Sequence, residues 1–102
     1  MRTEVTTHGI ELSDDLRMAV HHEAERLAQA LRRRINTVKV ELYEELDASQ
    51  SGHCARCQVD VLFDDGSSLA QVDEEDDLQR SVTEAFVKIL CNRRRHDSRL
   101  HH

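Results

Sequence analysis

Two segments of the chain space their apolar residues as amphipathic helices do. In the segment that begins at Leu78, apolar residues recur at i+4, i+7, i+8, i+11 and i+12, which places them on one helical face. In the segment that follows Ser13, a similar stripe continues to Leu31. Ser13 is a favourable N-cap, and the two aspartates after it suit the positive end of a helix. We therefore predict one helix from Ser13 to the arginines at positions 32–34 and another from Leu78.

Four further segments have the alternation or the composition of β-strands. Apolar and polar residues alternate through INTVKVELYEEL and CARCQVDVLF, as in strands with one buried face and one face in water. RTEVTT is rich in β-formers, and SLAQV is shorter and less regular. The predicted strands are residues 2–7, 35–46, 54–63 and 68–72.

The connections between these segments are short and polar. We predict a loop over Leu46–Gly52 and, at the sequence DDG of residues 64–66, a hairpin turn. The five acids of Asp73–Asp77 precede the last helical stripe. We expect them to cap that helix and to occupy its first turn, since helix N-termini favour carboxylates.

The element order is therefore β-α-β-β-β-α, and its length suits a single domain. We expect that domain over residues 1–96, with a flexible tail over residues 97–102. Strands with one wet face and two amphipathic helices predict an α+β fold of two layers, in which a four-stranded sheet carries both helices on one face.

Charge is distributed unevenly along the chain, whose net charge is −6. Residues 41–77 hold 12 acids and one base, whereas residues 78–102 hold six bases and two acids. Salt screens each charge over about 10 Å, so a local basic patch can bind phosphate although the whole chain is acidic. The basic C-terminal segment is therefore the first candidate for a nucleic-acid contact.

Several features indicate a cytoplasmic protein. The N-terminal segment lacks the apolar core of a secretion signal, and no apolar run approaches the ~20 residues of a membrane helix. The three cysteines form an odd set, which suits reduced thiols. We find no H-E-x-x-H, nucleophile elbow or phosphate-binding glycine loop. We expect no enzymatic activity, no cofactor, no small-molecule substrate and no membrane partner.

The sequence GHCARC contains a C-x-x-C spacing that could suggest zinc or thiol chemistry. On a strand, side chains three positions apart point to opposite faces. Cys57 then lies on the apolar face with Val59, while Cys54 lies on the other face or in the preceding loop. Two sulfurs aimed apart cannot share a metal ion, so we expect no metal site here. The acids of Asp73–Asp77 also lack the spacing of a calcium loop.

The order and spacing of three segments resemble the ribosome hibernation promoting factor family, also known as sigma-factor modulation proteins. GIELSDDLRMAV resembles the family's first helix, INTVKVEL its second strand, and DLQRSVTEAFVKI followed by RRRH its second helix. The resemblance implies a fold related to double-stranded RNA-binding domains. It also implies binding to the small ribosomal subunit across the channel for messenger and transfer RNA, and so a silent ribosome under stress. Since the chain stops soon after the second helix, we expect the short form of the family.

Six basic residues are candidates for contact with ribosomal RNA. Arg17 and Arg26 stand at basic positions of the family's first helix. Lys88 and Arg95 are seven residues apart, two turns along one helical face. The predicted nucleic-acid-binding residues are Arg17, Arg26, Lys88, Arg94, Arg95 and Arg99. The contacts would read phosphate and RNA shape, with Tyr43 the only ring available for stacking on the wet face. The alternative is that cations near a helix end only complement its dipole.

Two other functions remain open from the residues alone. The same fold could be a protein-interaction module without ribosome binding, whose acidic middle suits a basic partner. On a ribosome, the same acids could instead meet basic ribosomal proteins. Less favoured is a small zinc or thiol protein that uses Cys54 and Cys57. Phosphate-driven binding should weaken steeply as salt rises, whereas an apolar protein interface should not.

Overall fold

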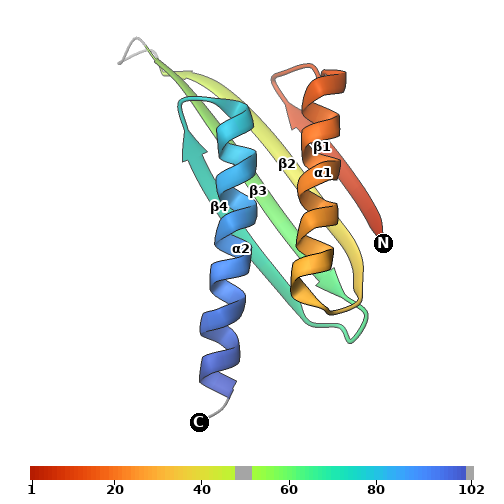
Figure 1. Ribbon diagram of the computed structural model, residues 1–102. Coiled ribbons are helices and arrows are strands. Elements are labelled where there is room, and N and C mark those ends of the chain that lie inside the picture. Colours follow the sequence, from red (N-terminus) through yellow and green to blue (C-terminus); the bar gives the residue numbers. More distant parts are fainter. Residues whose placement is uncertain (48–51, 101–102) are drawn as a thin grey trace.

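The structure is a computed structural model that describes the backbone of residues 1–47 and 52–100 and the side chains of residues 1–44 and 54–91. Two helices lie side by side on one face of a four-stranded sheet (Figure 1). The elements in chain order are β1 (Arg2–His8), α1 (Asp14–Leu31), β2 (Ile35–Asp47), β3 (Gly52–Phe63), β4 (Ser68–Glu75) and α2 (Leu78–Leu100). The predicted element order and two-layer α+β fold are confirmed.

The sheet has the strand order β1-β2-β3-β4, in which β1 is parallel to β2 and the other neighbours are antiparallel. The predicted alternation holds in β2, where Val38, Val40 and Leu42 are buried under the helices. Lys39, between them, is exposed on the outer face. A register shift between Ile35 and Thr37 interrupts the ladder near the start of β2. Within residues 1–47 and 52–100, no helix covers the outer face of the sheet (Figure 1).

Helix α1 begins and ends where local chemistry favours it. The Oγ of Ser13 accepts a hydrogen bond from the backbone N–H of Leu16 at 3.1 Å, as predicted for an N-cap. Arg32 ends the helix in the left-handed conformation, with φ of 52°. Five apolar residues of α1 are buried: Leu16, Val20, Ala24, Leu27 and Leu31. Over the described residues, neither helix is both long and apolar enough to span a membrane.

Two predicted boundaries are wrong. Strand β2 continues to Asp47 and β3 begins at Gly52, so both ends of the expected loop over Leu46–Gly52 are strand. Residues 48–51, which make up the rest of that loop, lie outside the described part. Strand β4 continues to Glu75 because Asp73 still pairs with Cys57 of β3 in the ladder. The acids at 73–75 therefore precede α2 as strand, and no acid lies in its first turn.

The C-x-x-C sequence lies within β3, and its two thiols point to opposite faces as predicted. Cys57 is fully buried in the core, whereas Cys54 is half-buried on the other face. Burial, followed by the nearby charge of Asp73, raises the pKa of the Cys57 thiol from 9.0 to about 12. Cys57 is therefore an unreactive core residue, and no group of three metal-binding side chains occurs among the described residues.

Candidate nucleic-acid interface

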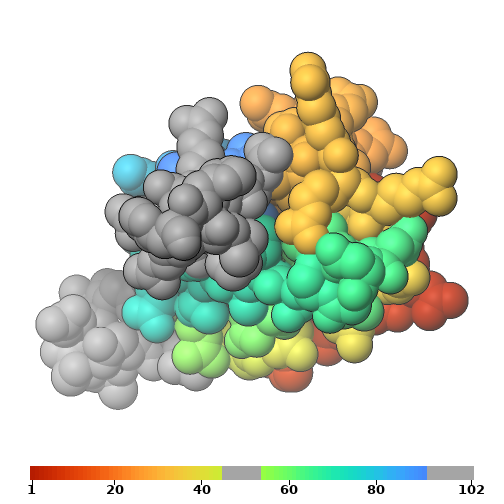
Figure 2. Space-filling model, turned by 90° about the horizontal axis from the view of Figure 1, so that it is seen from below, coloured from red at the N-terminus to blue at the C-terminus, as the bar shows by residue number. Residues whose placement is uncertain are grey.

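The two helices run in the same direction, so their C-terminal ends lie at the same end of the molecule (Figure 1). Figure 2 views this end and shows the last residues of α1 beside the β3–β4 hairpin. The segment that leaves α1 carries Arg32, Arg33 and Arg34. The backbone of α2 continues here through an arginine-rich sequence to Leu100. We call this part the basic end, comprising Arg32–Arg34 and the C-terminal half of α2.

The opposite end of the molecule is acidic. The first turn of α1 contains Asp14 and Asp15 there, and the end of β4 with the β4–α2 connection contributes Glu74–Asp77. Because both helices present their positive dipole ends here and their negative ends at the other side, the charges complement the dipoles at both ends. Apart from Asp64 and Asp65 of the hairpin at the basic end, charge is therefore polarised along the helix direction.

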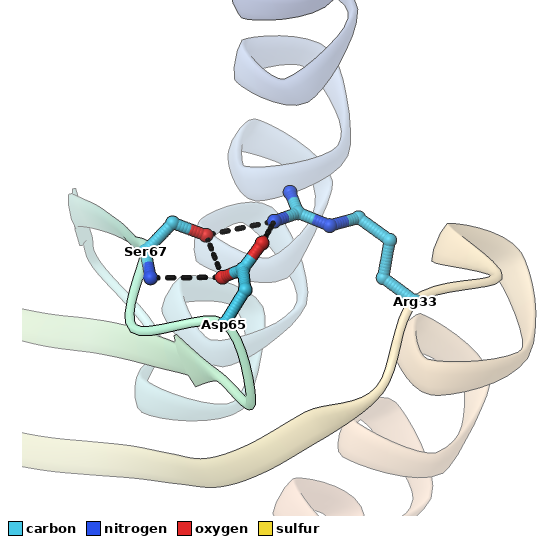
Figure 3. Close-up of polar contacts among 3 residues, drawn as sticks. All are labelled: Arg33, Asp65 and Ser67. Carbon is cyan, nitrogen blue, oxygen red and sulfur yellow. Dashed lines mark hydrogen bonds and ion pairs between the residues drawn. The ribbon is translucent and has the colours of Figure 1, made fainter.

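Arg33 joins the α1–β2 connection to the β3–β4 hairpin (Figure 3). Its Nη2 lies 3.0 Å from Oδ2 of Asp65 and donates to Oγ of Ser67 at 2.7 Å. Its guanidinium lies 3.7 Å from the ring centroid of Phe63. The hydrogen bond from the Ser67 hydroxyl lowers the pKa of the Asp65 carboxyl, with smaller contributions from Arg33. Arg33 is thus a structural residue whose charge is neutralised locally.

Arg32 and Arg34 flank this contact and have exposed side chains. The backbone N–H of Asp64 donates to the carbonyl of Arg34 at 3.0 Å, so the backbone beside the hairpin is fixed. Among the side chains that the structure describes, neither Arg32 nor Arg34 has an ion-pair partner. These two guanidinium groups are therefore open to solvent beside the hairpin.

The predicted residues of α1 are exposed but far apart. Arg26 has a side chain that is 68% exposed, and its Nη1 lies 3.6 Å from Oε1 of Glu23, a surface ion pair of little strength. Arg17 is exposed near the start of α1. At 1.5 Å per residue, Arg17 lies roughly 22 Å along the helix from Arg32, whereas Arg26 lies roughly 9 Å from it.

Lys88 makes contacts within the protein. Its Nζ lies 2.7 Å from Oδ1 of Asp73 and donates to the carbonyl of Val72 at 3.1 Å. The hydrogen bond to Asp73 raises the pKa of Lys88. Two of its three N–H donors therefore hold α2 against β4. The side chains of the remaining predicted residues, Arg94, Arg95 and Arg99, lie outside the described part of the structure.

Asp73 is a buried acid between β4 and α2, only 5% exposed. Its Oδ1 meets Lys88, while its Oδ2 has no hydrogen-bond partner among the described residues. The pKa of the neighbouring Glu75 carboxyl is raised, first by desolvation and then by Asp73. The ion pair with Lys88 therefore offsets most of the free-energy cost of burying the Asp73 carboxylate away from water.

The ring of Tyr43 has a neighbour from each adjacent strand. The ring of His8 stacks on it with centroids 4.4 Å apart and planes 6° apart. The guanidinium of Arg56 lies 4.3 Å from the Tyr43 centroid, and the Tyr43 hydroxyl donates to Oε2 of Glu41 at 2.5 Å. Because β1 and β3 flank β2, these neighbours occupy opposite sides of the ring. A base could stack on Tyr43 only by displacing one of them.

The sequence matches the model of the family described as sigma 54 modulation protein / S30EA ribosomal protein over residues 3–101. The chain belongs to the sigma 54 modulation protein / S30EA ribosomal protein family. No curated protein matches its sequence. The family assignment therefore rests on nearly the whole chain, in agreement with the segments that resembled it.

Two solved structures are similar to this family member in fold. A ribosomal subunit interface protein from Coxiella burnetii superposes with a TM-score of 0.79 at 16% identity and covers 96% of this chain and 99% of its own. The N-terminal domain of Protein Y from Thermus thermophilus gives a TM-score of 0.65 at 22% identity, with 91% of this chain and 94% of its own covered. At these identities the likeness concerns the fold.

Arg32 and Arg34 are candidates that the sequence pattern alone does not single out. In the sequence, the arginine triplet indicates only the end of a helix whose dipole it complements. Its position became informative only with the parallel course of the helices, which brings it to the same end as the last turns of α2 (Figure 1). A signal that could have found it is the recurrence of arginines directly after both helical stripes.

Proposed function

We propose that this protein is a ribosome-associated translation inhibitor that binds the small ribosomal subunit. Its family is described as sigma 54 modulation protein / S30EA ribosomal protein, and one structural neighbour is a ribosomal subunit interface protein. The observation that carries the proposal is the basic end, because a member of a ribosomal family with one cationic end has a surface suited to RNA phosphate. The protein would act in the cytoplasm, by occupancy rather than by catalysis.

The contacts that we propose with RNA phosphates are made by the arginines of the basic end. Arg32 and Arg34 are exposed and unpaired among the described side chains, and Arg26 holds only a weak surface pair. An arginine fork can bond two phosphate oxygens at once. Arg94, Arg95 and Arg99 follow in the sequence of α2 and extend the proposed surface. Lys88 supports it indirectly by holding α2 on β4.

The mechanism we propose is steric. With its basic end against ribosomal RNA, the domain would occupy the channel of messenger and transfer RNA and so block translation. The contacts would read phosphate positions and RNA shape, because both sides of the Tyr43 ring are taken. The acidic end would face away from the RNA or meet basic ribosomal proteins, since like charges repel it from phosphate.

A pair of single charge reversals tests the orientation of binding. Arg34→Glu at the basic end should weaken binding to purified small ribosomal subunits about tenfold at low salt, because it replaces an attraction to phosphate with a repulsion. Arg80→Glu is the matched control: Arg80 is also exposed, but it lies at the start of α2 near Glu75. Equal effects of the two variants would contradict the proposed orientation.

A protein-interaction module on the same fold is the second candidate function. It is favoured by two exposed apolar side chains on the open face of the sheet, Leu62 (42% exposed) and Val72 (44% exposed). Such a module would bind its partner with little dependence on salt. Binding that survives a rise from 50 to 200 mM salt without loss would favour this function over RNA contact.

A further inference from the structure

A groove of about 260 Å³ lies between the two helices. Its walls are mostly apolar: Leu27 and Ala30 of α1 face Phe86, Val87 and Leu90 of α2. Phe86 forms the floor at 2% exposure, whereas Val87 is 44% exposed on the wall. The groove is thus a place where core side chains come close to the surface of the helical layer.

The size of the groove limits what it can hold. Sites for drug-sized ligands measure roughly 300–1,000 Å³, so this groove suits one flat ring or one apolar side chain. Its rim is polar, with the guanidinium of Arg26 beside the carboxylate of Glu23 at 3.6 Å. The pair offers N–H donors and a carboxylate acceptor next to an apolar slot, which matches a planar ring with a hydrogen-bonding edge.

We propose that the groove receives one unpaired nucleobase of RNA. The inference rests on the proposed function and adds a base contact to its phosphate contacts. The groove reaches close to the basic end, since its lining includes Ala30, two residues before Arg32. A strand whose phosphates are bound by Arg32 would therefore bring a neighbouring base near the slot. Proteins that recognise single-stranded RNA commonly bind splayed-out bases beside such contacts.

Charge favours a nucleobase over an apolar side chain from a basic protein. A Lys- or Arg-rich segment would have to approach past Arg32 and Arg34, both exposed and unpaired among the described side chains. An RNA strand meets attraction at the same place. The acidic end, which would suit a basic segment, lies at the other end of the helices (Figure 1).

Filling the groove from either wall tests the inference. Ala30→Trp and Val87→Phe enlarge side chains at exposed positions, so they occupy the slot with little cost to the core. Gln29→Trp is the matched control, since Gln29 is exposed on α1 beside the groove without lining it. Each variant is first checked for an unchanged thermal unfolding midpoint. Binding is then measured with purified small ribosomal subunits and with the protein-free RNA of that subunit.

We expect each filled variant to bind both probes about tenfold more weakly than the wild type, a typical loss for one base contact. The dependence of binding on salt should stay the same, because no phosphate contact is removed. Gln29→Trp should bind as the wild type. If both filled variants bind with wild-type affinity, the inference that the groove receives a nucleobase is wrong, while the proposed function stands.

Two further outcomes also decide against the inference. If the filled variants weaken binding to intact subunits but not to protein-free RNA, the occupant is a protein side chain rather than a nucleobase. If the wild type itself binds neither probe, the proposed function fails and the groove inference fails with it. These outcomes are distinguishable because only the last one affects the unmodified protein.

Discussion

Removing the Lys88 ammonium should destabilise the fold by more than a surface lysine normally contributes. Lys88→Met keeps an unbranched chain of similar length. It leaves Asp73, whose side chain is 6% exposed, without the cation that pairs with it among the described residues. A hydrogen bond to a charged group contributes about 1.5–3 kcal/mol. Because the Lys88 side chain is itself 47% exposed, we place the loss near the low end, at about 2 kcal/mol.

The measurement is thermal unfolding followed by circular dichroism at neutral pH. For a domain of this size, about 2 kcal/mol corresponds to a fall of about 8–16 °C in the midpoint. Lys39→Met is the matched control, since Lys39 is the other lysine of the chain and is exposed on the outer face of the sheet. That variant should change stability by less than about 0.5 kcal/mol. Equal shifts for the two variants would refute the reasoning.

The pH dependence of the same pair gives an independent check. The hydrogen bond to Asp73 raises the pKa of Lys88 above its ordinary 10.5. The stability from this contact is therefore fully present below about pH 10.5 and is lost as pH rises through the folded-state pKa. The gap between the wild type and Lys88→Met should narrow in that alkaline range. Asp73→Asn combined with Lys88→Met should recover part of the lost stability, because the double variant has no buried charge.

Three further predictions concern single residues. Ser13→Ala removes the N-cap acceptor of α1 and should lower the free energy of unfolding by about 1 kcal/mol in urea titrations; an unchanged midpoint would contradict the cap. Gly66 has φ of 89°, so Gly66→Ala should cost about 1 kcal/mol or more by the same measurement, and a neutral result would rule out the strain. Burial raises the pKa of the Cys57 thiol to about 12, so the wild type should lose stability from pH 9 upward. In urea titrations repeated across this pH range, Cys57→Ala should reduce the loss of stability with rising pH, and Cys54→Ala should leave it unchanged.

The fold was predictable from the sequence because its main determinants are local. The alternation in β3 places Cys57 inside and Arg56 outside, and each residue needed only its neighbours to be assigned. The N-cap at Ser13 is likewise a contact over three residues. Strand and helix patterns of this kind reflect which face of the element meets water. They can therefore be recognised in the sequence without knowledge of the tertiary structure.

The errors came from contacts between residues distant in sequence. An acid at position 73 looked like part of a helix cap, because nothing nearby indicated that Lys88 would neutralise it inside the seam. Tyr43 looked free for stacking, because its neighbours His8 and Arg56 lie on other strands. Sequence patterns are therefore misleading for polar residues whose interaction partners lie on another helix or strand.

The candidate site was predictable only in part. The arginines of the last segment were recognised from charge alone. The proposed contribution of Arg32 and Arg34 depends on the two helices running in the same direction, which follows from the sheet topology rather than from either helix (Figure 1). The groove between the helices depends equally on their packing, since its walls combine residues of α1 and α2 that are more than 50 positions apart.

Sedimentation with ribosomal subunits tests the central claim most directly. The purified protein is mixed with separated small and large subunits, and each mixture is run through a sucrose gradient at 50 and at 200 mM salt. We predict that the protein travels with the small subunit at low salt and is largely released at the higher salt, because several phosphate contacts are lost to counterions. Sedimentation apart from both subunits at low salt would contradict the account.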